Sequence, residues 1–210
     1  MQIESIFERR RFVFLDGAMG TQLQKRGLKV GQKPELAALE MPEVLTSIHA
    51  EYVTAGADLL LANTFGANAR KLAGTGYSVA QVVEASLACA RKAAEESGTL
   101  VGLDIGPLGE LLAPAGTLPF EDAYDAFAEI VGAGVQAGAD FIFLETMTDL
   151  YELKAAILAA KEHSQLPVFV SMSFESRGRT FTGCTVESYG VTAAGLGAAA
   201  AGAAGRRPPP

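Results

Sequence analysis

Cysteine is scarce in this chain: only Cys89 and Cys184 occur among its 210 residues. Two cysteines cannot build the disulfide framework of a small secreted domain, so the composition indicates a protein of the reducing cytoplasm. Cys89 lies among Ala, Leu and Val within an expected helix. This setting predicts a small buried hydrophobic residue rather than a reactive thiol.

Positive charge and long apolar runs are also in short supply. Lys and Arg number 17 against 24 Asp and Glu, which gives a formal net charge of −7. This negative excess argues against nucleic acid or an anionic membrane as the main partner. No stretch reaches the roughly 18 apolar residues of a membrane-spanning helix. The Arg9–Arg11 cluster is followed by an apolar run too short for a signal peptide, so neither nucleic acid nor a membrane is expected as a partner.

The chain does contain a regular alternation of apolar runs and amphipathic stretches. Short apolar runs, typical of strands buried on both faces, start near residues 12, 58, 99, 140 and 167. Helices are expected over residues 1–11, 42–55, 79–96, 121–137 and 149–163. Residues 21–41, which contain Gly and Pro, are interpreted as a long loop. Strands that alternate with helices in this way predict parallel β/α units.

Acidic residues end three of the expected strands. Asp16, Asp104 and Glu145 follow the first, third and fourth apolar runs directly. Polar strand ends are typical of a TIM barrel, whose active site lies at the carboxyl ends of its strands. A doubly wound sheet is the competing fold, but the Gly17–Gly20 turn lacks the G-x-G-x-x-G spacing of a dinucleotide site. Since eight units take about 250 residues, we predict an incomplete TIM-type (β/α)8 barrel of about five to six units.

The composition changes near residue 196. We expect residues 1–196 to form one partial barrel, because hydrophobic residues make up 49% of the chain and suffice for a single large core. Residues 197–210 are rich in Ala, Gly and Pro and lack the patterning of a strand or a helix. They are interpreted as an abnormal, low-complexity tail.

Five segments carry distinctive motifs: LDGAMGTQLQKRG (15–27), AGADLLLANTFGAN (55–68), DIGPLGELLAPAG (104–116), LETMTDLYELKAA (144–156) and MSFESRGRTFTG (172–183). In this order they resemble the homocysteine-binding barrel of cobalamin-dependent methionine synthases and of the wider homocysteine S-methyltransferase family. The resemblance runs from about residue 5 to residue 198. It implies a methyltransferase that moves a methyl group to the sulfur of homocysteine and so produces methionine.

The resemblance also implies six substrate-binding residues: Asp16, Gly17, Asn63, Thr64, Asp104 and Glu145. Asp16 and Gly17 would lie at the substrate carboxylate, where backbone N–H groups donate. Glu145 would accept a charge-assisted hydrogen bond from the ammonium group, a role we favour over that of a helix-start partner. Asn63 and Thr64 would line the same pocket. For Asp104, shaping its own Asp-Ile-Gly-Pro loop is an equally good interpretation.

By the same resemblance the family uses zinc to activate the thiolate, with cobalamin and methyltetrahydrofolate on further domains or a separate corrinoid protein. Three cysteines bind that zinc: one in an Asn-Cys pair that closes the sixth strand, and a Cys-Cys pair much later. Aligning Gly202 with the family's glycine puts Ala204 and Gly205 in the Asn-Cys positions. The later pair would lie beyond Pro210. We therefore expect a C-terminally truncated chain that neither holds zinc nor methylates homocysteine.

No other residue of the sequence is expected to replace those cysteines. Cys184 falls in a loop to which the family motif assigns no metal, and a thiolate zinc site needs several converging ligands. His49 and His163 are expected within or at the end of helices, away from the strand ends. The zinc expectation therefore depends on the missing cysteines alone.

Two other functions stay open from the sequence. One is a non-catalytic barrel fragment, which would self-associate through its open sheet edges. The other is a magnesium-dependent lyase or hydrolase that uses Asp16, Asp104 and Glu145 as ligands. A Schiff-base aldolase is disfavoured, because no lysine stands at an expected strand end.

Overall fold

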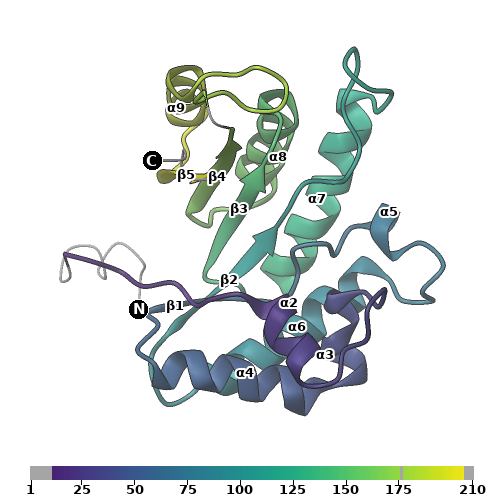
Figure 1. Ribbon diagram of the computed structural model, residues 1–210, viewed down its shortest axis with the longest axis vertical. Helices are drawn as coiled ribbons and strands as arrows, with labels where there is room; N and C mark the ends of the chain where they lie inside the picture. The colour runs from purple at the N-terminus through teal and green to yellow at the C-terminus, as the bar shows by residue number, and fades with distance from the viewer. Residues whose placement is uncertain (1–10, 176, 206–210) are drawn as a thin grey trace.

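The computed structural model describes residues 11–175 and 177–205. Five parallel strands form one sheet in the order in which they occur in the chain: β1 Leu59–Leu61, β2 Leu100–Ile105, β3 Phe141–Met147, β4 Val168–Phe174 and β5 Ala200–Gly205. Each crossover therefore steps in the same direction, as in a growing barrel, whereas a doubly wound sheet reverses its strand order. The prediction of an incomplete β/α barrel is confirmed (Figure 1).

Helices connect successive strands and lie along the outside of the sheet (Figure 1). The long ones are α4 Pro42–Thr54, α6 Val79–Ala94, α7 Phe120–Gln136, α8 Leu150–His163 and α9 Val186–Gly195. The sequence predicted the first four to within two residues at each end. Side-chain caps fix several starts, since Ser78, Asp149 and Thr185 accept from backbone N–H groups of α6, α8 and α9.

The two faces of the sheet have different neighbours. On β2, Val101 and Leu103 point outward and belong to the main core shared with the helices. Leu100 points inward and packs with inner residues of the neighbouring strands. Side chains alternate along a strand with a period of two, so Asp104 follows Leu100 on the inner face. The inner face is thus apolar at the start of the strands and becomes acidic toward their carboxyl ends.

The first expected strand is not buried, and this prediction is wrong. Phe12 and Phe14 are 65% and 62% exposed. Only Leu15 pairs with β1, through an isolated bridge to Leu59, although the segment runs beside β1 and the N–H of Asp58 donates to the Phe14 carbonyl (Figure 1). Among the described residues no strand lies on its other side. Both rings are therefore largely exposed, although the Arg11 guanidinium lies 5.5 Å from the centre of the Phe12 ring.

Two further predictions differ from the structure. Residues 21–41 are not a continuous loop, because they contain most of α2 Met19–Lys25 and all of η1 Pro34–Leu36 and α3 Ala37–Glu40. Residues 200–205, within the expected tail, form β5 against β4. The helix expected over residues 1–11 lies almost entirely outside the described residues. The short α5 Ala69–Leu72 follows β1.

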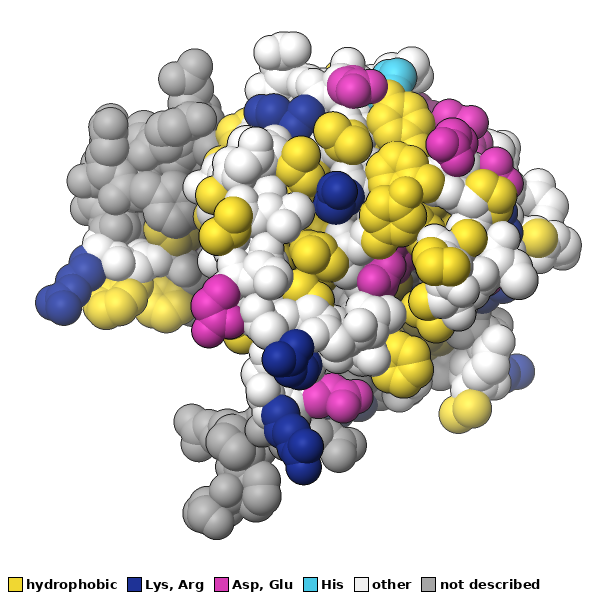
Figure 2. Space-filling model, turned by 90° about the horizontal axis from the view of Figure 1, so that it is seen from above, with side chains coloured by type: hydrophobic (Ala, Val, Ile, Leu, Met, Phe, Trp, Pro, Cys, Tyr) yellow, Lys and Arg dark blue, Asp and Glu magenta, His cyan; other side chains and the backbone are white. Residues whose placement is uncertain are grey.

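Exposed side chains give one face of the molecule a mixed character. Seen from above, hydrophobic side chains cross the middle of this face and are interrupted by single basic and acidic ones (Figure 2). Among the described residues, no helix is both long enough and apolar enough to cross a membrane.

Candidate functional site

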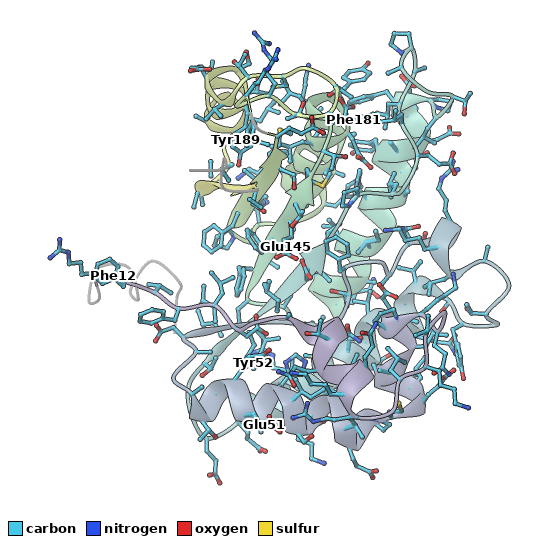
Figure 3. All side chains as sticks on the ribbon, in the orientation of Figure 1. Phe12, Glu51, Tyr52, Glu145, Phe181 and Tyr189 are labelled. Carbon is cyan, nitrogen blue, oxygen red and sulfur yellow. The ribbon has the colours of Figure 1, made fainter. Side chains whose placement is uncertain are left out.

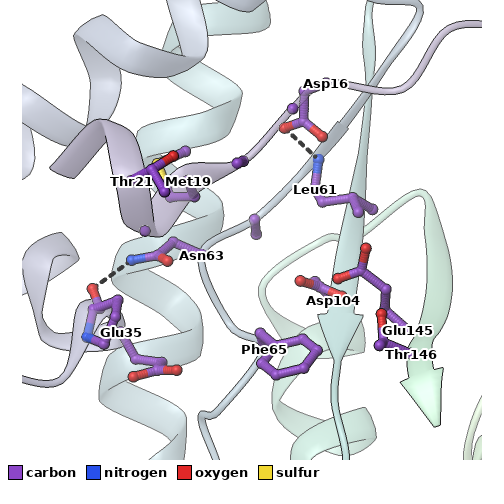
Figure 4. Close-up of a pocket in the computed structure, with 15 residues that line it drawn as sticks. Asp16, Met19, Thr21, Glu35, Leu61, Asn63, Phe65, Asp104, Glu145 and Thr146 are labelled. Carbon is purple, nitrogen blue, oxygen red and sulfur yellow. Dashed lines mark hydrogen bonds between the residues drawn. The ribbon is translucent and has the colours of Figure 1, made fainter. Parts of the chain in front are cut away.

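A cavity of about 610 Å³ opens at the carboxyl ends of the first strands (Figure 4). Its volume falls within the range of small-molecule sites. It is lined by the turn before α2, by η1, by the segment after β1 and by the ends of β2 and β3: residues 16–21, Pro34, Glu35, residues 61–63, Phe65, Asp104, Glu145 and Thr146. The prediction that Asp16, Asn63, Asp104 and Glu145 share one face is therefore confirmed.

Asp16 is held between the first segment and β1. Its backbone N–H donates to the Leu59 carbonyl at 3.0 Å, and its Oδ2 accepts from the N–H of Leu61 at 3.1 Å. Burial, together with the smaller effect of the Glu145 charge, raises the pKa of Asp16 to about 7, although the hydrogen bond from Leu61 lowers it in part. At neutral pH this carboxyl group is therefore poised between its two protonation states.

Asp104 and Glu145 lie next to each other on neighbouring strands (Figure 4). Asp104 Oδ1 is buried without a hydrogen-bond partner. Burial raises the pKa of Asp104 well above its usual range, and the charges of Glu145 and Asp16 add to this rise. Burial likewise raises the pKa of Glu145.

The described residues that line the cavity include four acids, Glu35 being the fourth, and no Lys, Arg or His. Carboxyl groups this close together raise one another's pKa unless a positive charge comes between them. A cation in the cavity would relieve this mutual repulsion.

A bulge in β3 brings Glu145 and Thr146 to the cavity together. The pairing of β3 with β4 changes register between Leu144 and Met147. Thr146 has a φ of 57°, which is unusual for a β-branched residue, and its N–H donates to Ser171 Oγ at 2.9 Å. Bulges of this kind redirect side chains near functional sites.

The remaining predicted site residues have different positions. Asn63 lines the cavity and its Nδ2 donates to the Pro34 carbonyl at 2.6 Å. Thr64 is buried behind the cavity wall, where its hydroxyl donates to the Asp104 carbonyl at 2.7 Å and accepts from the Asp104 N–H at 3.1 Å. Thr64 thus supports Asp104 and does not line the cavity. Gly17 does line it.

Sequence reasoning did not name several of the lining residues, among them Glu35, Phe65 and Thr146. Phe65 belongs to a recognised motif, so its neighbours Asn63 and Thr64 were a signal for it. Glu35 lies in the segment interpreted as a loop. Thr146 also belongs to a recognised motif, next to Glu145, but its bulge has no signal in the sequence, because a bulge depends on the pairing of two strands.

The described residues do not supply the zinc ligands of the family. Cys89 is 7% exposed, which confirms the prediction that it is a small buried residue. Its Sγ lies 3.7 Å from the Pro42 carbonyl. Cys184 lies in the loop before α9, where burial raises the pKa of its thiol. Gly205, which the sequence expectation aligned with the first zinc position, ends β5. Nowhere in residues 11–175 and 177–205 are three or more His, Cys, Asp or Glu side chains grouped to hold a metal ion.

That finding also gives no support to the magnesium alternative, which relied on Asp16, Asp104 and Glu145 as joint ligands. The expectation that His49 lies away from the strand ends is wrong. His49 extends from α4 so that its Nδ1 lies 3.9 Å from Asp16 Oδ2. His163 lies at the end of α8 beside Tyr124, away from the cavity, as expected.

Comparison with known proteins places the chain in a family. The family model described as homocysteine S-methyltransferase matches residues 13–204. The methionine synthases of Mycobacterium leprae and Mycobacterium tuberculosis are each 33% identical over 218 residues, an alignment that covers 90% of this chain. The chain spans 18% of the length of each of these relatives.

Solved structures agree on the fold. The metallated form of the homocysteine methyltransferase MmuM from Escherichia coli matches with a TM-score of 0.86 at 22% identity. The match covers 96% of this chain and 77% of that one. Its barrel shares the architecture seen here, and the family model covers nearly all described residues. The chain therefore belongs to the homocysteine S-methyltransferase family.

Proposed function

We propose that the cavity binds homocysteine by its amino-acid end. The observation that carries this proposal is the group of four acidic side chains, with no basic one, among the described lining residues. An ammonium group placed between Glu145 and Asp104 would separate two carboxyl groups whose pKa values are raised. It would also give Asp104 Oδ1 the partner that it lacks. Charge-assisted hydrogen bonds of this kind are the strong ones.

The carboxylate of the substrate is assigned to the turn before α2. The N–H of Asp16 already donates to Leu59, so the donors are those that follow it. Gly17 and Ala18 both line the cavity. A substrate carboxylate here would lie across from Glu145 and would avoid the acidic side chains of β2 and β3. This arrangement separates the two charges of an amino acid zwitterion across one cavity.

Methyl transfer needs a thiolate, and a free thiol has a pKa of about 8.5. The described residues that line the cavity include no Lys, Arg or His, and no three His, Cys, Asp or Glu side chains of the described part of the chain are grouped to hold a metal ion. We therefore propose that this chain binds homocysteine without methylating it on its own. The methyl donor would reach the site through a corrinoid-binding domain or protein that carries cobalamin and receives its methyl group from methyltetrahydrofolate.

The binding experiment is calorimetric titration of the 210-residue chain with reduced L-homocysteine, with and without added zinc. Two analogues of homocysteine test its two charged groups separately: one lacks the amino group and the other lacks the carboxylate. We expect the analogue without the amino group to bind at least tenfold more weakly, since it leaves Glu145 and Asp104 facing each other. Equal affinity for all three ligands would refute the assignment of the cavity.

The matched variants are Glu145→Gln and Glu187→Gln. Glu145 lines the cavity, whereas Glu187 is exposed in the first turn of α9. We expect only Glu145→Gln to weaken homocysteine binding. A chain that folds and binds none of the ligands would favour the alternative of a non-catalytic barrel fragment. Methyl transfer from methylcobalamin above background would refute the proposal that the chain does not act alone.

A further inference from the structure

His49 is buried in the core without a hydrogen bond. Its side chain is 0% exposed, and neither Nδ1 nor Nε2 has a partner. A buried polar group in this state costs about 1–3 kcal/mol relative to one that is satisfied. Most buried side-chain polar atoms in folded proteins have a partner. The position therefore calls for an explanation other than packing.

His49 lies close to a residue of the site. Its Nδ1 lies 3.9 Å from Asp16 Oδ2, about 1 Å beyond a hydrogen bond. Burial lowers the pKa of His49 to about 4, so the ring is neutral at neutral pH. The contact is therefore not an ion pair in this state. In the tautomer that carries its proton on Nδ1, the neutral ring is a donor that faces the Asp16 Oδ2 acceptor across a small gap.

We propose that His49 is a positioning residue for Asp16: when the ammonium group of the ligand lies between Glu145 and Asp104, His49 Nδ1–H donates to Asp16 Oδ2 and keeps that carboxylate turned toward the ammonium group and away from the substrate carboxylate. This inference rests on the proposed function, because it needs an ammonium group in the cavity. It adds a side chain from α4 that lies outside the cavity lining.

Electrostatics supply the force that closes the gap. A cation in the cavity favours the ionised form of Asp16. An ionised carboxylate is a stronger acceptor than a neutral carboxyl group, and its hydrogen bonds are shorter. The buried imidazole of His49 has no other partner to give up. Ligand binding and formation of this bond would therefore stabilise each other.

The geometry of α4 makes the required movement small. Tyr52 lies three residues after His49 and so on the same side of the helix. Its hydroxyl donates to the Ala18 carbonyl at 3.1 Å, and it extends from α4 toward the start of α2 (Figure 3). The helix thus already holds the chain just beyond Asp16. An approach of about 1 Å between Asp16 Oδ2, which also accepts from the Leu61 N–H, and His49 Nδ1 would complete the contact.

The first test is spectroscopic and uses the intact chain. The chain has only two histidines, so His163→Asn assigns the ring nitrogens of His49 in a ¹⁵N-labelled sample. We expect reduced L-homocysteine at saturation to raise the fraction of His49 that carries its proton on Nδ1 and to move that signal downfield. An unchanged His49 spectrum while homocysteine binds would overturn the role of His49 alone. Absence of binding by the wild-type chain would overturn the binding proposal as well.

The second test compares replacements at this position. His49→Asn keeps an N–H donor near the place of Nδ1, whereas His49→Leu removes it and fills the space. We expect His49→Leu to weaken homocysteine binding about tenfold, and His49→Asn to recover most of that loss. Ile48→Val, which removes one methylene from the buried side of α4, controls for loosened packing. Equal affinities for the Asn and Leu variants would overturn the proposal, and the spectroscopic test stands if either variant fails to fold.

Discussion

At the scale of single residues, the acidic side chains of the cavity oppose folding at neutral pH. Burial raises the pKa of Asp16 to about 7. In the unfolded chain the same carboxyl group ionises near its ordinary value of 3.8. The folded state therefore binds more protons between these two values. A raised carboxyl pKa means that stability is gained as pH falls from about 7 and is fully present below the unfolded value.

The first prediction follows from this sign. On lowering the pH from about 7 to about 5, the free energy of unfolding of the wild-type chain should rise by about 2 kcal/mol more than that of Asp16→Asn, whose amide does not titrate. The comparison between the two chains is needed because His49, with its lowered pKa, acts in the opposite direction. Urea denaturation at both pH values measures the difference. Parallel stability curves would contradict the prediction.

Gly17 is required by contact rather than by backbone conformation. A Cβ at this position would come within 2.9 Å of the Tyr52 ring. We expect Gly17→Ala to cost about 1–3 kcal/mol of stability, because the turn or the ring must move, and to weaken homocysteine binding. Gly20→Ala is the control: a Cβ there has no atom within 4 Å, and alanine favours the helix. Chemical denaturation of both variants gives the comparison, and similar losses would count against the contact.

At the scale of elements, the periodicity of apolar residues predicted the helices and strands whose burial follows that periodicity. Four long helices and the strands that alternate with them were predicted because each buries one face or both faces. The acidic strand ends were predicted to share one face because parallel β/α units put the carboxyl ends of all strands on the same side. The predictions that were wrong concern segments whose structure depends on their neighbours in the fold. The 12–15 segment is apolar but has one neighbouring strand, and α2 lies in a segment whose Gly and Pro favoured a loop.

The bulge at Thr146 belongs to this scale, because it arises only where β3 pairs with β4. A positive φ strains a β-branched residue, whereas glycine adopts it freely. We therefore expect Thr146→Gly to be about 1 kcal/mol more stable than Thr146→Ala, the reverse of the order in an ordinary strand. Thermal and chemical denaturation of the pair measure this. An alanine variant that is equally or more stable would show that the bulge carries no strain.

At the scale of the whole molecule, β5 explains why composition misjudged the end of the sheet. Its residues are Ala and Gly, so no branched side chain signals a strand. Backbone hydrogen bonds attach β5 to the sheet, since it pairs with β4 along its full length. The hydroxyl of Tyr189 adds a link by donating to the Gly202 carbonyl at 2.8 Å. Such contacts leave no pattern in the local sequence.

The open edges of the sheet lead to the last prediction. No described strand pairs with the outer side of β5 or of the 12–15 segment, and unpaired edges are templates for association. Phe12 and Phe14 are largely exposed beside one of them. We expect the isolated chain to self-associate as its concentration rises, and the double variant Phe12→Ser with Phe14→Ser to associate less. Phe181→Ser, which removes a ring 71% exposed in the loop before α9, should change association little. Sedimentation velocity over a hundredfold concentration range measures all three chains, and a monomer at every concentration with a sharp cooperative melt would contradict the prediction.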